Sequence, residues 1–189
     1  AMDFKYEDVR AMPDRHIDIC LFNGAIRTDE DAHIARLLRA KSRALIAFGS
    51  CASEGCIPGL ANIQGPDHAL ARAAFTTPTT DNPGEVMFTP RYTVPEGELT
   101  LPALTRQLRT LEQVVPIEYT IPGCPPNHDQ VWKAITAAIE NRLPEPGSLL
   151  GVDPRTVCDQ CARVRAGKIR VERFFRPHEI IPDLERCFL

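Results

Sequence analysis

The sequence lacks any apolar run near the 18–20 residues that a membrane span needs, so an integral membrane protein is not expected. It has no excess of basic residues: 22 Lys and Arg face 25 Asp and Glu, which argues against nucleic-acid binding. Seven cysteines among 189 residues are too few for a disulfide scaffold. The first residues are charged rather than apolar, so no signal peptide is expected.

The composition that remains is that of an ordinary globular domain, with 43% hydrophobic and 25% charged residues. The cysteines are odd in number and unevenly spaced. Without export signals, this pattern favours reduced thiols that ligate metal or carry redox chemistry. We therefore expect a cytoplasmic protein with functional cysteines.

Hydrophobic patterning predicts an α/β fold. Apolar and polar residues alternate over 17–22, and Thr28 with Asp31 forms a capping box at the start of a helix. Residues 44–48 are then continuously apolar, which is typical of a strand buried on both faces of a parallel sheet. This order predicts a strand-helix-strand unit.

A second unit of the same kind is predicted downstream. A helix is expected from apolar residues at helical spacing, namely Leu104, Leu108, Leu111 and Val115. A strand follows over 117–121, and Asn127 with a reciprocal Gln130 caps the next helix. Between the two units, the Pro- and Thr-rich residues 76–102 are expected to be irregular.

The chain is expected to divide near residue 147. Residues 1–147 form the predicted open parallel sheet with helices on both faces. Residues 148–189 are basic beyond 151, have little periodicity and carry three of the seven cysteines. We therefore predict an irregular, cysteine-containing segment that is organised by metal more than by a core.

Two cysteines directly follow predicted strands, Cys51 after 44–48 and Cys124 after 117–121. Ligands of open parallel sheets bind outside the carboxyl ends of the strands, so these two thiols can converge on one site. Glycines beside them let the backbone approach an inorganic cluster, and their amides can donate to its sulfurs. Two structural thiols at strand ends are the alternative.

The remaining cysteines are of different kinds. Cys158 and Cys161 form a C-x-x-C, a spacing that serves half a zinc site, a redox pair or an iron-sulfur ligand pair. Cys187 could add a third ligand to that pair. Cys20 lies inside the first predicted strand, on the face opposite Ile19 and Leu21, and is interpreted as a structural thiol.

Three motifs taken together resemble the small subunit of nickel-iron hydrogenases. They are GSCASEGCIPGLAN at 49–62, IPGCPPN at 121–127 and VCDQC at 157–161. The resemblance covers almost the whole chain and points to the cytoplasmic, methyl-viologen-reducing group. The wider family includes the 20 kDa subunit of NADH:quinone oxidoreductase. The resemblance implies a flavodoxin-like domain that holds a proximal 4Fe-4S cluster.

The resemblance also implies ligand sets. Cys51 and Cys124 match two of the four proximal ligands, whereas Cys158, Cys161 and Cys187 match three ligands of a distal 4Fe-4S cluster. The family has further strand, loop and cysteine segments on both sides of the matched region, so the sequence resembles a fragment that lacks the first strand and cluster loop. Cys56 matches the extra cysteine of oxygen-tolerant members, whose proximal cluster is 4Fe-3S; the alternative is a small thiol that replaces glycine.

By this resemblance, the chain is the electron-transfer subunit of a hydrogenase and is not catalytic alone. It would relay electrons between the active site of a large subunit and an electron-accepting iron-sulfur or flavin subunit. One alternative is a complex I 20 kDa-type subunit that passes electrons to quinone, against which the downstream C-x-x-C argues. Another is a cluster-free flavodoxin-like binding module, which requires Cys51 and Cys124 to lie too far apart to share a ligand.

Overall fold

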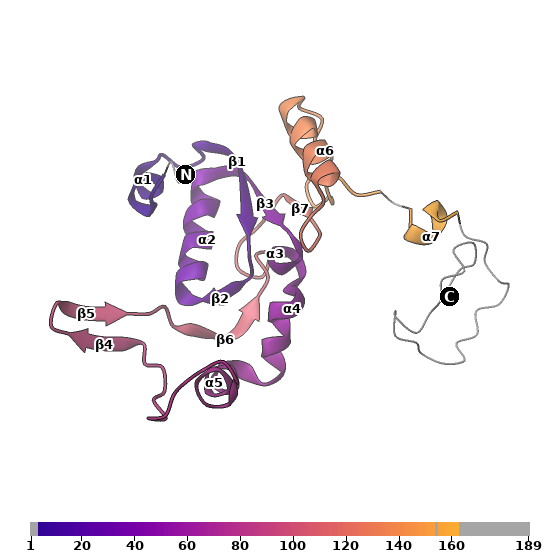
Figure 1. The fold of residues 1–189 in the computed structure, drawn as a ribbon. Coiled ribbons are helices and arrows are strands. Elements are labelled where there is room, and N and C mark those ends of the chain that lie inside the picture. The colour runs from indigo at the N-terminus through magenta and orange to yellow at the C-terminus, as the bar shows by residue number, and fades with distance from the viewer. Residues whose placement is uncertain (1–3, 154, 163–189) are drawn as a thin grey trace. The chain divides into compact units, whose positions relative to one another are not determined.

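The computed structural model of the protein describes residues 4–153 and 155–162, and the chain divides into two units, Ala1–Val152 and Asp153–Leu189 (Figure 1). The helices of the first unit are α1 (Tyr6–Ala11), α2 (Asp29–Lys41), α3 (Ser50–Glu54), α4 (Cys56–Gly59), the 3-10 helix η1 (Leu60–Ile63), α5 (Gly65–Ala71), the π-helix η2 (Arg72–Thr76) and α6 (His128–Ile139). Its strands are β1 (Ile17–Asn23), β2 (Ile26–Thr28), β3 (Ser42–Phe48), β4 (Arg91–Val94), β5 (Gly97–Thr100), β6 (Leu104–Arg109) and β7 (Tyr119–Ile121).

The central sheet is parallel, with the strand order β1-β3-β7 (Figure 1). Leu21 of β1 pairs with Ile46 of β3, which in turn pairs with Tyr119 of β7. Helix α2 connects β1 to β3, so the predicted strand-helix-strand unit is confirmed. The short strand β2, which precedes α2 and pairs with β6 in a separate antiparallel ladder, was not predicted.

Helices cover both faces of this sheet, as expected for the predicted α/β architecture. On one face, Leu45 and Ala47 of β3 pack in a core with buried alanines of α2 and α3, Ala32, Ala35 and Ala52. On the other face, Ile46 packs with Tyr119, Ile121 and Ala134 of α6. Successive β3 residues thus belong to opposite cores, which explains why the strand is a continuous apolar run.

Helix α2 begins as predicted. The Thr28 hydroxyl accepts from the Asp31 amide at 3.0 Å, and the Asp31 carboxylate accepts from the Thr28 amide at 2.8 Å. Near its other end, Arg39 pairs with Glu118 at 2.7 Å, and the same carboxylate accepts from the Leu45 amide at 2.6 Å. A single carboxylate therefore joins α2, β3 and the segment that leads into β7.

The predicted helix over 104–115 is wrong. Residues 104–109 form strand β6, which pairs with β2, and one helical turn follows in which the Val115 amide donates to Leu111 at 3.0 Å. The apolar residues Leu108, Leu111 and Val115 are nevertheless buried. Spacing alone identified the core residues but could not reveal that β2 supplies hydrogen-bond partners for a strand.

Two further predictions need correction. Residues 76–102, expected to be irregular, contain an antiparallel hairpin of β4 and β5 (Figure 1).

The helix after Asn127 is confirmed as α6, with the Asn127 side chain accepting from the Gln130 amide at 3.0 Å. The reciprocal half of that cap is wrong, because the Gln130 side chain donates instead to the Pro122 carbonyl at 2.8 Å.

The face of β1 on the α6 side is only partly covered. Ile19 and Leu21 line an open apolar groove of about 210 Å³ together with Ile135 and Ile139 of α6. The outer edge of β1 pairs with no strand among residues 4–153 and 155–162.

Across those same residues, none of the helices has the length and apolar character that spanning a bilayer requires.

In the second unit, the structure describes residue 153 and residues 155–162. They contain the one-turn helix α7 (Val157–Gln160), which begins with a capping box between Thr156 and Asp159. The predicted division of the chain near residue 147, with a metal-organised segment over 148–189, stays a prediction.

The fully buried Leu45 should be a major contributor to stability. Replacing Leu45 with Ala leaves a cavity in the α2-side core, and we expect the free energy of unfolding to fall by about 2–5 kcal/mol. Urea denaturation followed by circular dichroism measures this. Leu99→Ala, at an exposed position of β5, is the control and should change the value by less than about 1 kcal/mol. Equal losses in both variants would contradict the assignment of the core.

Candidate functional site

The candidate site lies where β3 and β7 end. Gly49 follows β3 and precedes α3, whose second residue is Cys51. Cys124 follows β7 by three residues. Because β3 and β7 are parallel neighbours, both cysteine loops leave the same edge of the sheet, as the sequence predicted.

Three hydrogen bonds, each with a backbone amide as the donor, hold the two loops together. The Gly49 amide donates to the Ile121 carbonyl at 2.7 Å, and the Ser50 amide donates to the Gly123 carbonyl at 2.7 Å. In return, the Gly123 amide donates to the Ser50 hydroxyl at 3.2 Å. The loops are therefore positioned relative to each other by the backbone, and the cysteine side chains have no part in these bonds.

Glycine is required at two points of this junction. Gly123 has φ +136°, and a Cβ there would lie 2.5 Å from Pro126 Cα. Gly49 has φ +86°, and a Cβ there would lie 3.3 Å from the Gly123 carbonyl oxygen. Both positions combine a positive φ with close approach of other backbone atoms, from the same loop at Gly123 and from the facing loop at Gly49, which only glycine tolerates without displacement.

The structure corrects one expectation about these glycines. Their amides were expected to be available as donors to the sulfurs of a cluster. Instead, the amides of Gly49 and Gly123 donate across the junction, and the Gly55 amide donates to the Cys51 carbonyl at 3.3 Å. These three amides thus stabilise the loops, whereas the sequence analysis expected them to donate to the sulfurs of a cluster.

Three cysteines lie on the segments of this junction: Cys51 in α3, Cys56 in α4 and Cys124 after β7. The pKa of the exposed Cys124 thiol is raised, first by a hydrogen bond with Cys56 and by the charge of Cys56, and to a smaller extent by desolvation and the charge of Cys51. Cys51 and Cys56 are half-buried. That Cys51 and Cys124 share a ligand stays a prediction, and an influence of Cys56 on Cys124 was not predicted.

The chain turns sharply between α3 and α4. Gly55 ends α3 in the left-handed conformation with φ +80°, and Cys56, the first residue of α4, also has a positive φ of +43°.

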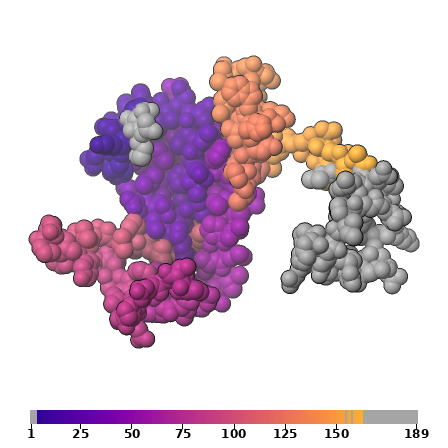
Figure 2. Space-filling model, in the orientation of Figure 1, coloured from indigo at the N-terminus to yellow at the C-terminus, as the bar shows by residue number. Residues whose placement is uncertain are grey.

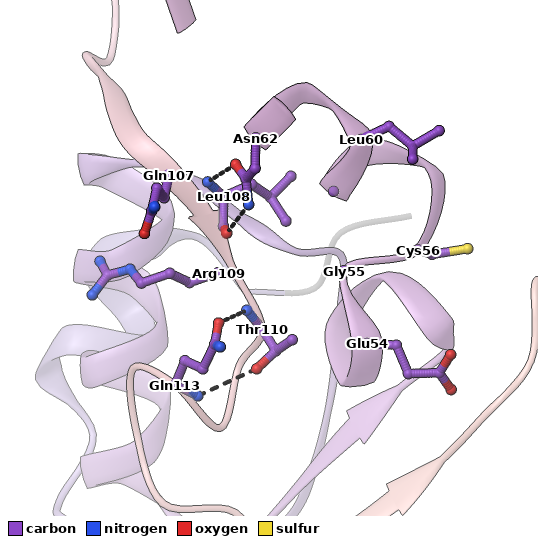
Figure 3. Close-up of a pocket in the computed structure, with 11 residues that line it drawn as sticks. Glu54, Gly55, Cys56, Leu60, Asn62, Gln107, Leu108, Arg109, Thr110 and Gln113 are labelled. Atoms are coloured by element: carbon purple, nitrogen blue, oxygen red, sulfur yellow. Dashed lines mark hydrogen bonds between the residues drawn. The ribbon is translucent and has the colours of Figure 1, made fainter. Parts of the chain in front are cut away.

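A pocket of about 420 Å³ lies beside this turn, between α3, α4 and β6 (Figure 3). Its wall is polar, and the Asn62 side chain both donates to and accepts from the backbone of Leu108. In Figure 3 the Cys56 sulfur points away from the other pocket residues. Cys56 lines this pocket, whereas Cys51 and Cys124 do not.

The remaining predicted ligands are placed as follows. Cys158 lies in α7 and Cys161 directly after it, and both are exposed. Cys187 lies outside the described residues. Within residues 4–153 and 155–162, no group of three or more His, Cys, Asp and Glu side chains is arranged to hold a metal ion. The thiols of Cys51 and Cys124 are of the donor type that an iron-sulfur cluster uses, but the described residues do not gather the four cysteines that such a cluster needs.

Comparison with known proteins assigns the family. The sequence pattern described as "NADH ubiquinone oxidoreductase, 20 Kd subunit" matches residues 1–138. The chain belongs to this family. The match includes both Cys51 and Cys124, so the junction of the two loops lies within the region that defines the family.

Relatives in the family are hydrogenase subunits. The chain is 40% identical to the iron-sulfur subunit of the F420-non-reducing hydrogenase of Archaeoglobus profundus, over 99% of this chain and 59% of that protein. It is 27% identical to the delta subunit of the NAD-reducing hydrogenase HoxS of Cupriavidus necator, over 71% of this chain and 61% of that protein. The chain thus spans about three fifths of the length of these relatives.

A solved structure agrees in fold. A chain in the crystal structure of an NAD+-reducing [NiFe]-hydrogenase in the H2-reduced state superposes with a TM-score of 0.58 and 27% identity. The superposition covers 68% of this chain and 67% of that chain. The α/β sheet is therefore an architecture found in a chain of a hydrogenase structure.

The thiols of the protein should differ in reactivity. Burial raises the pKa of the Cys20 thiol, an effect that the Ser42 hydroxyl and the Arg39 guanidinium partly offset. A raised pKa leaves less thiolate near neutral pH, so we expect iodoacetamide to modify Cys20 more slowly than the exposed Cys158 and Cys161, on the order of tenfold.

Peptide mass spectrometry over a time course measures these rates. The difference in modification rate between Cys20 and the two exposed cysteines should become smaller about two pH units above neutrality, because a larger fraction of Cys20 is then ionised. Equal rates near neutral pH would contradict the interpretation of Cys20 as a shielded structural thiol.

Proposed function

We propose that this chain is the iron-sulfur, electron-transfer subunit of a nickel-iron hydrogenase, and that Cys51 and Cys124 ligate its proximal 4Fe-4S cluster. The observation that carries the proposal is the hydrogen-bonded junction after β3 and β7, which holds the loops of Cys51 and Cys124 together at one edge of the sheet. When bound, such a cluster accepts and donates single electrons.

The protein's own residues have a positional part in this function. Gly49 and Gly123 allow the two loops to approach, and Ser50 joins them through its amide and its hydroxyl. Gln130 fixes the second loop to α6 through the Pro122 carbonyl. Two thiolates held by a rigid backbone are suited to a group that should change little in geometry on electron transfer.

The described residues supply only part of each proposed ligand set. Cys51 and Cys124 provide two thiolates, and a four-cysteine cluster needs further ligands from outside the described residues. Cys158, Cys161 and Cys187 are proposed ligands of a second, distal cluster. The role of Cys56 as an extra proximal ligand and the cytoplasmic location both stay predictions.

The relatives favour a hydrogenase over the two alternatives. Both relatives described above are named hydrogenase subunits, and one is named an iron-sulfur subunit, which does not favour a quinone-reducing role. A cluster-free binding module required Cys51 and Cys124 to be remote from each other, whereas hydrogen bonds hold the two loops that carry them together. The proposed partners are accordingly a hydrogenase large subunit and an electron-accepting iron-sulfur or flavin subunit.

Iron analysis tests the proposed ligands. In the full-length protein, purified without oxygen together with its large subunit, the Cys51→Ala and Cys124→Ala variants should each lose about four irons and the corresponding acid-labile sulfide. Electron paramagnetic resonance after dithionite reduction should lose the signal of one cluster. Cys20→Ala is the matched control and should keep both.

Total iron content also separates the alternatives. About twelve irons per subunit would agree with three four-iron clusters in a hydrogenase relay, whereas about four would favour a complex I-type subunit. Absence of iron from the anaerobically purified wild-type protein, or full iron content in the Cys51→Ala/Cys124→Ala double variant, would reject the proposed site.

An exposed apolar surface beside the cysteines is the proposed docking face for the large subunit. It consists of Ile57, Leu60 and Ile63 on α4 and η1, which are 71%, 62% and 78% exposed. Further exposed apolar residues follow in the segment from α5 to β5, which runs in magenta and pink along the bottom and lower left of Figure 2. Apolar patches of this kind on one side of a protein mark interaction surfaces.

Charged substitutions test this docking face. The Ile57→Asp/Leu60→Asp variant should bind the large subunit at least about tenfold more weakly, because burying a carboxylate in an apolar interface is unfavourable. Co-purification with a tagged large subunit, calibrated by titration, measures the loss. Phe4→Asp, an exposed position near α1, should bind like the wild type. Unchanged binding of the double variant would place the interface elsewhere.

A further inference from the structure

The peptide unit that joins Pro122 to Gly123 is held at both of its polar groups. Its carbonyl oxygen, which is that of Pro122, accepts a hydrogen bond from Gln130 Nε2 at 2.8 Å. Its amide, which is that of Gly123, donates to the Ser50 hydroxyl at 3.2 Å. A peptide unit is planar, so fixing both groups fixes the orientation of the whole unit. Cys124 is the next residue, and the direction in which the chain enters it therefore depends on these two bonds.

The local backbone does not fix this orientation by itself. Gly123 has φ +136°, and glycine adopts a wider range of backbone conformations than any other residue. Rotation about the single bonds on either side of the peptide unit would turn its carbonyl away from Gln130 and its amide away from Ser50. Ser50 is the neighbour of Cys51 in α3, whereas Gln130 lies in α6. Gln130 thus ties the Cys124 loop to a helix that carries no proposed ligand.

The segment 147–151 runs alongside β7 and is fixed there. The Leu150 amide donates to the Thr120 carbonyl at 2.8 Å, and Leu149 forms a parallel bridge with Thr120. The Leu150 side chain is buried in the core that β7 and α6 share. This segment is therefore a firm part of the first unit up to the residue that follows Leu150, which is Gly151.

Gly151 lies directly against Gln130. Its φ is +70°, and a Cβ at this position would lie 2.3 Å from the Gln130 carbonyl oxygen and 2.7 Å from Gln130 Cγ. Both distances are far shorter than any contact between heavy atoms that are not bonded, so only glycine fits here without displacing Gln130. The backbone at Gly151 thus packs on the residue that holds the Pro122 carbonyl.

We propose that Gln130 is a positioning residue for Cys124, which fixes the peptide unit before it, and that Gly151 keeps Gln130 in the place where it does so. This inference deepens the proposed function and rests on it in one respect, namely that Cys124 ligates a cluster. Both residues act through the loop and not as ligands. Groups that orient a metal ligand in this way typically change metal affinity by about 10- to 100-fold, so a loop held by Gln130 should retain its cluster longer.

The rate of iron release tests the role of Gln130. The full-length protein, purified anaerobically with its large subunit, is mixed with a ferrous-iron chelator, and the loss of iron is followed over time. Gln130→Met has a similar length but no donor, and it should start with the wild-type iron content and release about four irons on the order of tenfold faster. Gln130→Lys supplies a donor that reaches the same carbonyl and should restore slow release. Lys133→Met, at an exposed position of α6, is the control.

Electron paramagnetic resonance gives a second measurement on the same samples. In Gln130→Met, the g-values of the signal that Cys124→Ala removes should shift, because the position of one ligand changes. A variant that only lowers the stability of the fold would leave the g-values of the remaining clusters as in the wild type.

A second pair of variants tests the role of Gly151. Gly151→Ala should also release iron on the order of tenfold faster, because its Cβ displaces Gln130. Gly147→Ala is the matched control, since Gly147 has φ +95° in the same segment but a Cβ there would meet no atom within 4 Å. The Gln130→Met/Gly151→Ala double variant should release iron no faster than the faster single variant, because both changes disrupt the same hydrogen bond.

The outcomes separate this inference from the proposed function. Release from Gln130→Met at the wild-type rate, or equally fast release from Gln130→Lys, would overturn the role of Gln130. Equal acceleration in Gly147→Ala and Gly151→Ala, or additive effects in the double variant, would overturn the role of Gly151. Retention of iron by Cys51→Ala and Cys124→Ala would instead reject the proposed function, whatever the release rates are.

Discussion

The site depends on the hydrogen-bonded junction between the turn after β3 and the turn after β7. The Gly49 and Ser50 amides donate to carbonyls at the end of β7 and in the loop that follows it, and the Ser50 hydroxyl accepts from Gly123. Parallel strands alone would bring the two loops to the same edge of the sheet. These three bonds fix the distance between them, and the positions of Cys51 and Cys124 follow from that distance.

The sequence was sufficient to predict the parts of the fold that rest on local signals. The capping box of Thr28, the apolar run of β3 and the cap at Asn127 each depend on neighbours a few residues away. The placement of Cys51 and Cys124 at one edge followed from strand order in a parallel sheet. These predictions needed no knowledge of which distant segments meet.

The incorrect predictions concern residues whose structure depends on segments that are distant in the sequence. Strand β6 has apolar residues at helical spacing, but β2 provides its hydrogen-bond partners from about eighty residues earlier in the chain. The Gln130 side chain was expected to close its own cap and instead bonds Pro122.

The uncovered side of β1 has a consequence for how this polypeptide behaves in solution. Ile19 and Leu21 leave the apolar groove beside α6 open, and the outer edge of β1 pairs with no strand among the described residues. An unpaired strand with an apolar face is a template for further strands. Concentrated samples of this polypeptide are therefore prone to associate edge to edge, and covering β1 is a means of keeping them monodisperse.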